Sequence, residues 1–294
     1  MEPSRDLDGF LRVLHQVDAF PRTPEEWWER ARSAEPSAFR RYLIGEVEGA
    51  IIAIGALLDS DLIANAVTAR LVVDEAHRGR GRGRAMAEAL DALLGERDPA
   101  PILVNVRVRD DDSDGRAWAE RRGFRFHSHA IRSRLDLATF DPGAHLAVVD
   151  RARAAGYAFE PPDDGDRLYA LYAELIRDVP DQFDPMSRDA FRRQVDLRRD
   201  MARLVALHAS GWAGLALLSP AGPDGAFNDF TGVRPEHRGH GVATALKVLI
   251  AEEATRAGRS WIETVNHAHN GPMLAVNRAL GYRRVAGNVF LHRP

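Results

Sequence analysis

The stretch VDEAHRGRG, residues 73–81, returns as VRPEHRGHG, residues 233–241, 160 residues further along the chain. A repeat of this length indicates a duplicated domain, because solenoid units recur at much shorter spacings. Each copy follows two apolar, strand-like runs joined by a short turn that contains glycine, and each precedes a helical pattern of apolar residues. A second β-rich run and a second helix come next, and they end in ERRGF in one half and in NRALGY in the other.

This order of elements predicts an α/β (α+β) protein of two tandem domains. Each domain is expected to hold a mixed, mainly antiparallel sheet flanked by helices. Pro142 and Gly143 follow the last strand-like run of the first half, so the domains are predicted to span residues 1–141 and 142–294.

Composition limits the possible classes of function. The 294 residues are 45% hydrophobic and 28% charged, as in a globular protein, and the net charge of −3 has the wrong sign for a nucleic-acid binder. The lack of cysteine excludes disulfides, thiolate metal sites and a cysteine nucleophile. The apolar run at residues 50–58 is too short to span a membrane, and the acidic start lacks the layout of a signal peptide, so we expect a cytoplasmic protein.

The repeated stretch itself is typical of a site for an anion with several oxygens. A strand, a glycine-rich turn and a helix start present backbone N–H groups and the positive end of the helix dipole. A P-loop would require a Gly-Lys-Ser/Thr sequence, but Lys247 is the single lysine and lies in the middle of a predicted helix. A dinucleotide fingerprint would require a differently spaced third glycine within a parallel βαβ unit. A disordered arginine-glycine segment that binds RNA is a further, remote alternative.

The pattern R-x-x-G-x-G/A, at Arg78, Gly81 and Gly83 and again at Arg238, Gly241 and Ala243, resembles the pyrophosphate loop of GCN5-related N-acetyltransferases, the GNAT family. The resemblance covers roughly residues 40–137 and 157–292 in a tandem layout, and it implies an enzyme that transfers an acetyl group from acetyl-CoA to a primary amine of a small molecule or a protein N-terminus. It implies no metal, nucleic-acid or membrane partner. The residues that it places against acetyl-CoA are Thr231, Val233, Arg238, Gly239, His240, Gly241, Val242, Ala243, Thr244 and Asn270 in the second half, and Val73, Arg78, Gly79, Arg80, Gly81, Arg82 and Gly83 in the first.

The same resemblance suggests where the chemistry takes place. The pantetheine arm would lie between the strand that ends at Val233 and the strand at residues 261–265, and these two strands must then diverge. A strand N–H near Val233 would stabilise the oxyanion. Asp229 and Glu263 are the candidate bases for the amine proton, and each is equally typical of an ordinary strand carboxylate.

A tyrosine that protonates the leaving thiolate in many family members is replaced here by Asn277. The first half has Ala69 opposite Asp229 and Ala119 opposite Asn277. We therefore expect the second half to be catalytic, whereas the first half either binds coenzyme A or serves as a degenerate scaffold. A non-catalytic acyl-CoA sensor remains the alternative for the whole chain.

Three further polar or aromatic features are interpreted structurally. The pairs His127 and His129, and His267 and His269, are predicted to be exposed histidines at strand ends and not metal ligands. Trp27 and Trp28 are expected to pack a helix onto the core.

Overall fold

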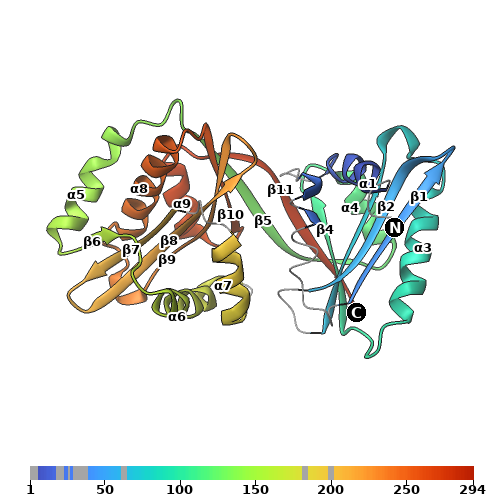
Figure 1. Ribbon diagram of the computed structural model, residues 1–294, viewed down its shortest axis with the longest axis horizontal. Coiled ribbons are helices and arrows are strands. Elements are labelled where there is room, and N and C mark those ends of the chain that lie inside the picture. Colours follow the sequence, from blue (N-terminus) through green and yellow to red (C-terminus); the bar gives the residue numbers. More distant parts are fainter. Residues whose placement is uncertain are drawn as a thin grey trace. The chain divides into compact units, whose positions relative to one another are not determined.

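The computed structural model describes residues 6–17, 23–25, 27–28, 39–60, 65–180, 185–197 and 202–294, with no statement on the side chains of residues 193–197. Its contacts divide the chain into two compact units (Figure 1). The first unit comprises Met1–His127 and Val289–Pro294, and the second comprises Ser128–Asn288.

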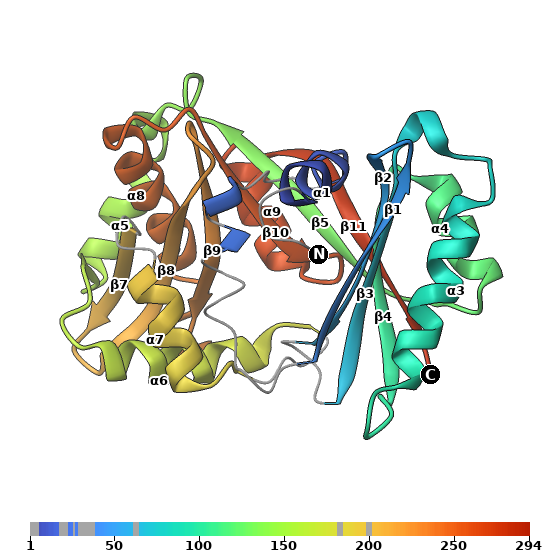
Figure 2. The same cartoon turned by 45° about the vertical axis from the view of Figure 1, so that its right-hand side comes forward.

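The first unit is built on a sheet with the strand order β1-β2-β3-β4-β11. The chain runs antiparallel from β1 through β2 to β3, and β4 is parallel to β3. Helix α1 packs on one face and contributes Phe10 and Leu14, whereas Met86 and Leu90 of α3 belong to a separate apolar cluster (Figure 2). The elements are α1 (Asp6–Leu14), β1 (Arg40–Val47), β2 (Ala50–Asp59), β3 (Ala66–Val73), α3 (Arg82–Gly95), β4 (Leu103–Arg109), α4 (Ser113–Arg121) and the end of β11 (Arg283–Arg293).

The second unit repeats this plan. Its strands follow the order β5-β10-β9-β8-β7-β6; β7, β8 and β9 are antiparallel, and β10 is parallel to β9. Helices α5 and α8 pack on one face and α6 and α7 on the other, as Figure 1 also shows. The elements are β5 (Arg125–Asp136), α5 (Leu146–Ala154), β6 (Ala158–Glu160), α6 (Gly165–Leu175), α7 (Arg188–Leu197), β7 (Ala202–His208), β8 (Gly211–Ala221), β9 (Gly225–Val233), α8 (Val242–Arg256), β10 (Trp261–His267) and α9 (Gly271–Ala279).

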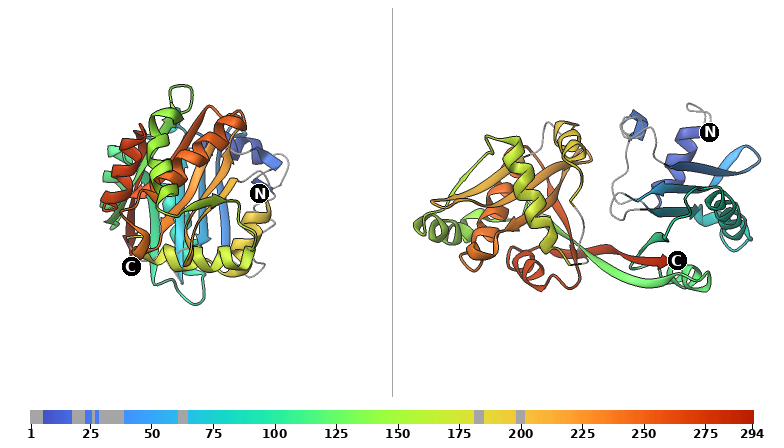
Figure 3. Two further views of the ribbon diagram at one scale, coloured as in Figure 1. Left: turned by 90° about the vertical axis from the view of Figure 1, so that its left-hand side faces the viewer. Right: turned by 90° about the horizontal axis from the view of Figure 1, so that it is seen from below.

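Two long strands belong to both units. Strand β5 starts in the first unit and continues from Ser128 in the second, and β11 ends in the first unit from Val289 onward. The two strands are neighbours in the sheet and can be followed in Figure 3. The compact units therefore divide at 127/128 and 288/289, whereas the boundary expected from the sequence lies at 141/142.

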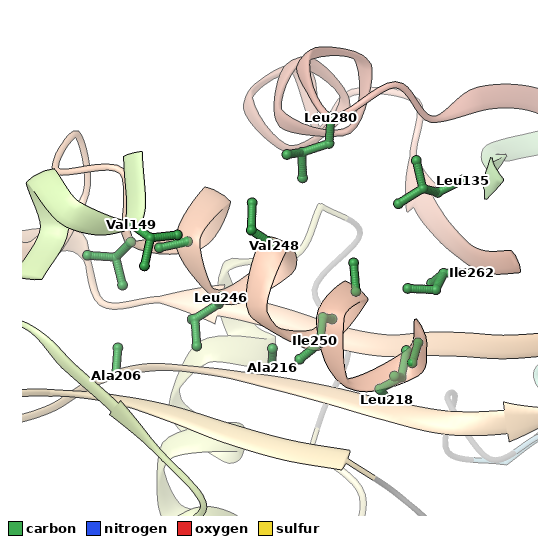
Figure 4. Packing of buried hydrophobic residues seen from close by; sticks show 14 of the residues in the cluster. Leu135, Val149, Ala206, Ala216, Leu218, Leu246, Val248, Ile250, Ile262 and Leu280 are labelled. Carbon is green, nitrogen blue, oxygen red and sulfur yellow. The ribbon is translucent and has the colours of Figure 1, made fainter. Parts of the chain in front are cut away.

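The core of the second unit forms around α8. Leu246 and Ile250 are fully buried on the side of α8 that faces Ala206 and Ala216 of the sheet, and Val248 is fully buried on the opposite side of the helix (Figure 4). Each such aliphatic side chain contributes about 1.5–3 kcal/mol when it leaves water. Because apolar residues surround α8 on most sides, Lys247 is buried along with them.

The predicted fold class and the order of elements are confirmed. After β5, a short 3₁₀ turn (Pro142–His145) leads into α5. Trp27 and Trp28 pack on the α1 cluster, as expected. Among the described residues, no helix is long and apolar enough to cross a membrane.

Candidate active site

The two glycine-rich loops have the same geometry. Gly81 and Gly241 cap α3 and α8 in the left-handed region, at φ values of 77° and 78°. This region disfavours residues with a Cβ, which explains glycine at both positions. Arg78 Nε donates to the Val73 carbonyl over 3.1 Å, and Arg238 Nε donates to the Val233 carbonyl over 3.0 Å. Each arginine thus ties its loop to the end of the preceding strand.

The helix starts fit an anionic ligand. Neither Gly81 nor Gly241 provides a side-chain cap, so the amides of the first helical turn still have donor capacity. A Cβ on Gly79, Gly81 or Gly239 would meet nothing within 4 Å, so the space beside the loops is open. At Gly241 a Cβ would lie 2.9 Å from Val148 Cγ2. The donor groups and the open space match what a pyrophosphate requires.

The remaining loop residues differ between the two copies. Arg82 Nη1 contacts His77 Nδ1 at 2.8 Å in the first unit, whereas in the second unit His237 Nδ1 lies 2.9 Å from the buried Tyr157 hydroxyl. The exposed loop residues are Arg78, Gly79, Arg80, Gly81, Arg238, Gly239 and His240, and the partly or fully buried ones are Arg82, Gly83, Gly241, Val242, Ala243 and Thr244.

The expected divergence of two parallel strands is confirmed. Pairing between β9 and β10 runs from Gly225 and Trp261 to Asn228 and Thr264, and it ends there. Beyond that point β9 pairs only with β8, and β10 continues along β5. Val265, the next residue of β10, is 39% exposed. Strands β3 and β4 of the first unit likewise pair only from Ala66 to Ala69.

A β-bulge distinguishes the second unit. In the pairing of β8 with β9, Leu217 lies opposite Phe230 and Leu218 opposite Asn228, so Asp229 is one extra residue on β9. A bulge re-aims the inserted residue and locally ends regular pairing. Asp229 therefore sits directly after the last residue that pairs with β10. The pairing of β2 with β3 is regular from Val67 to Val73, and Ala69 lies in an unbroken ladder.

Glu263 occupies a different environment. Its carboxylate is buried, with only 1% of the side chain exposed, and it forms ion pairs with Arg132 and Arg134 of β5. Arg134 Nε lies 2.6 Å from one oxygen, and Arg132 binds the other. Both carboxylate oxygens are bound by guanidinium groups, so the arrangement suits a structural ion cluster better than a base.

The other predicted residues are held by local contacts. Asn270 Oδ1 accepts from the Met273 N–H over 3.2 Å and caps α9, as Asp112 caps α4 in the first unit. Asn277 is buried, and its Nδ2 donates to Asn266 Oδ1 over 2.7 Å. Thr231 donates to Asn228 Oδ1 over 3.0 Å. An amide such as Asn277 cannot supply the acidic proton of a tyrosine.

Two polar residues beneath the bulge were not predicted from the sequence to belong to the site. Asn228 is buried, and Lys247 Nζ donates to its Oδ1 over 2.5 Å. The available signal was a single lysine on the apolar pattern of α8 in a chain that otherwise uses arginine. Its partner on β9 was not readable from spacing. In the part of the chain that the structure describes, neither histidine pair belongs to a group of three or more side chains that could hold a metal ion.

Comparison with known proteins identifies the family of the chain. A family model described as the acetyltransferase (GNAT) family matches residues 8–124, in the first half of the chain. Together with the relatives below, it shows that the chain belongs to the GNAT family, whose members transfer an acetyl group from acetyl-CoA.

The chain is also similar to individual curated proteins and to solved structures. A mycothiol acetyltransferase of Clavibacter sepedonicus is 30% identical over 231 residues, which cover 77% of this chain and 73% of that protein. A mycothiol acetyltransferase of Clavibacter michiganensis is 29% identical and covers 99% of this chain and 97% of its own length. A tandem GNAT protein from the clavulanic acid biosynthesis pathway shares the fold over the whole chain and 96% of its own length, with a TM-score of 0.77 and 22% identity.

Proposed function

We propose that the second unit catalyses the direct transfer of an acetyl group from acetyl-CoA to a primary amine. The single observation that carries this proposal is the bulge at Asp229. It places a carboxylate on β9 where β9 and β10 separate, on the same strand that leads into the glycine loop.

The cofactor-binding role proposed for the loop rests on its backbone. The N–H groups at the start of α8 would bind the pyrophosphate of acetyl-CoA, and Arg238 keeps the loop attached to the end of β9. The strand edges exposed by the divergence offer backbone groups to the pantetheine arm. An N–H near Val233 would stabilise the oxyanion as negative charge develops on the carbonyl oxygen.

The chemistry assigned to this site is simple. The amine nitrogen forms a bond with the acetyl carbonyl carbon, the carbon–sulfur bond breaks, and Asp229 accepts the proton that the amine loses, directly or through water. The thiolate takes its proton from solvent. Coenzyme A thiolate is a fair leaving group, so an asparagine at position 277 is compatible with turnover.

The names of the relatives indicate which acceptor to test first. Both Clavibacter proteins are named mycothiol acetyltransferases, so we propose the desacetyl precursor of mycothiol as the first amine for this chain. The first unit is proposed to bind acetyl-CoA without transfer, because it shares the loop geometry but has Ala69 in a regular ladder.

The test is the release of free thiol from acetyl-CoA in the presence of a panel of amines that includes this precursor. Thiol release that requires both acetyl-CoA and an amine supports a transferase. Calorimetric binding of acetyl-CoA with no thiol release from any amine would instead support the alternative, a non-catalytic acyl-CoA sensor.

A further inference from the structure

Asn228, Lys247 and the bulge at Asp229 form one connected polar group beside the apolar cluster that packs around α8. Asn228 is 2% exposed and Lys247 is 1% exposed. Buried polar groups are costly unless they are hydrogen-bonded, so a buried lysine whose amine ends on an asparagine requires an explanation. None of the acetyl-transfer steps described above uses either residue.

The Asn228 amide bridges the irregularity in the ladder. Its Nδ2 donates to the Leu217 carbonyl and to the Phe230 carbonyl, both over 2.9 Å. These two residues lie opposite each other on β8 and β9, immediately beyond the extra residue. A bulge disrupts ladder bonds, and buried carbonyls need a donor. The side chain of Asn228 supplies donors at this point.

The other end of the amide is held as well. Asn228 Oδ1 accepts from Lys247 Nζ over 2.5 Å and from the Thr231 hydroxyl over 3.0 Å. Two donors at the oxygen and two carbonyls at the nitrogen use the full capacity of the amide and allow only one orientation. Asn228 and Thr231 are three residues apart yet contact each other, which regular alternation along a strand would not allow.

The first unit provides a comparison within the same chain. Because Asp229 is an extra residue, the last residue of β3 that pairs with β4, Ala69, corresponds to Asn228, and Ala87 of α3 corresponds to Lys247. Neither alanine can supply the amide or the amine. The β2–β3 ladder has no shift in this region. The amide, the amine and the bulge are thus all present in the second unit and all missing from the described part of the first.

We propose that Asn228 and Lys247 are positioning residues that maintain the β9 bulge and thereby aim Asp229 into the space between β9 and β10. This inference rests on the proposed function only in the role given to Asp229. Burial lowers the pKa of Lys247 to about 7, and among the described residues no carboxylate forms an ion pair with it, which fits an amine kept for its hydrogen bond.

The sharpest test is Asn228→Asp, which keeps the shape and the acceptor toward Lys247 but removes both bonds to the bulge carbonyls. We expect kcat to fall about 10- to 100-fold because Asp229 is misplaced, with the Kd for acetyl-CoA within about threefold of the wild type. Lys247→Met should act in the same direction. The matched control is Thr255→Val, which removes a hydroxyl bond to Ala251 at the far end of α8 and should leave kcat unchanged.

An unchanged kcat in a folded Asn228→Asp protein, or a parallel loss of kcat and acetyl-CoA binding, would overturn the proposal. If Lys247→Met does not fold, the Asn228 variant decides. If the wild type transfers no acetyl group, the proposed function fails separately, and crystal structures of the wild type and of Asn228→Asp decide this inference. A changed β8–β9 register at Asp229 supports it, and an unchanged register refutes it.

Discussion

The two units share a glycine-rich loop but differ in the strand that leads into it. Both loops place glycine at positive φ before the helix, and both tie an arginine to the preceding strand end. Strand β9 of the second unit carries a bulge with a carboxylate, Asp229, as the extra residue. The pairing of β3 with β2 in the first unit is regular over the described residues. The loop geometry proposed to bind acetyl-CoA is thus present in both copies, whereas the geometry proposed for catalysis is present in one. The family model matches residues 8–124, in the first copy, whereas the proposed catalytic residues lie in the second.

The largest expected effect comes from the bulge residue itself. Asp229→Asn should lower kcat about 100-fold or more, because it removes the proposed base while keeping its shape. Steady-state kinetics of thiol release measures this. The matched change Ala69→Asp in the first unit should not add activity, since position 69 lies in a regular ladder. A variant Asp229→Asn that turns over normally would remove Asp229 from the mechanism.

The loops can be compared by Gly241→Ala and Gly81→Ala. Both changes place a Cβ at positive φ, which costs roughly 1–2 kcal/mol, and at Gly241 the Cβ would also press on Val148. We expect Gly241→Ala to weaken acetyl-CoA binding in the second unit at least about tenfold, and Gly81→Ala to affect only a first-unit site. Calorimetry that counts binding sites separates the two. Equal and unaltered binding in both variants would show that the loops do not hold the ligand.

The buried lysine predicts a pH dependence of stability that the first unit lacks. The pKa of Lys247 is about 7 in the folded chain and has its ordinary value of 10.5 when the chain unfolds. Between these values unfolding takes up a proton, so raising the pH stabilises the fold, by at most about 1.4 kcal/mol per pH unit. Denaturant unfolding of the wild type and of Lys247→Met from pH 7 to pH 10 measures the difference. Parallel curves for the two proteins would mean that Lys247 titrates normally.

The smallest effect concerns an ion pair between a helix and the residue that follows β3 or β9, and its charges are reversed between the two units. Arg12 of α1 binds Asp74 in the first unit, whereas Glu174 of α6 binds Arg234 in the second. Arg12→Gln and Glu174→Gln should each cost about 1 kcal/mol or less, measured by denaturant unfolding, because both pairs are largely at the surface. A much larger loss in either variant would indicate a role beyond a surface ion pair.

The contribution of the Arg12–Asp74 ion pair to stability also depends on pH. The hydrogen bond from Arg12 is the main cause that lowers the pKa of Asp74 below 3.8. Its stabilising effect is therefore complete above that value and is lost as the pH falls through the lowered pKa. The difference in stability between the wild type and Arg12→Gln should shrink in acid, which the same unfolding series carried down to pH 3 would detect.

The duplication, the order of helices and strands, and both glycine loops can be predicted from the amino-acid sequence alone. The helices and strands follow from local periodicity. The two loops follow from backbone conformations that only glycine adopts readily, and they can be recognised in residues 73–83 and 233–244. Three other features became known from the tertiary structure. Glu263 is bound by two arginines about 130 positions earlier in the chain, and β11 ends in the first unit. Asp229 sits in a bulge next to Asn228, which binds Lys247. A bulge exists only relative to the partner strand, and an ion cluster only once its strands have paired, so neither leaves a pattern along a single segment.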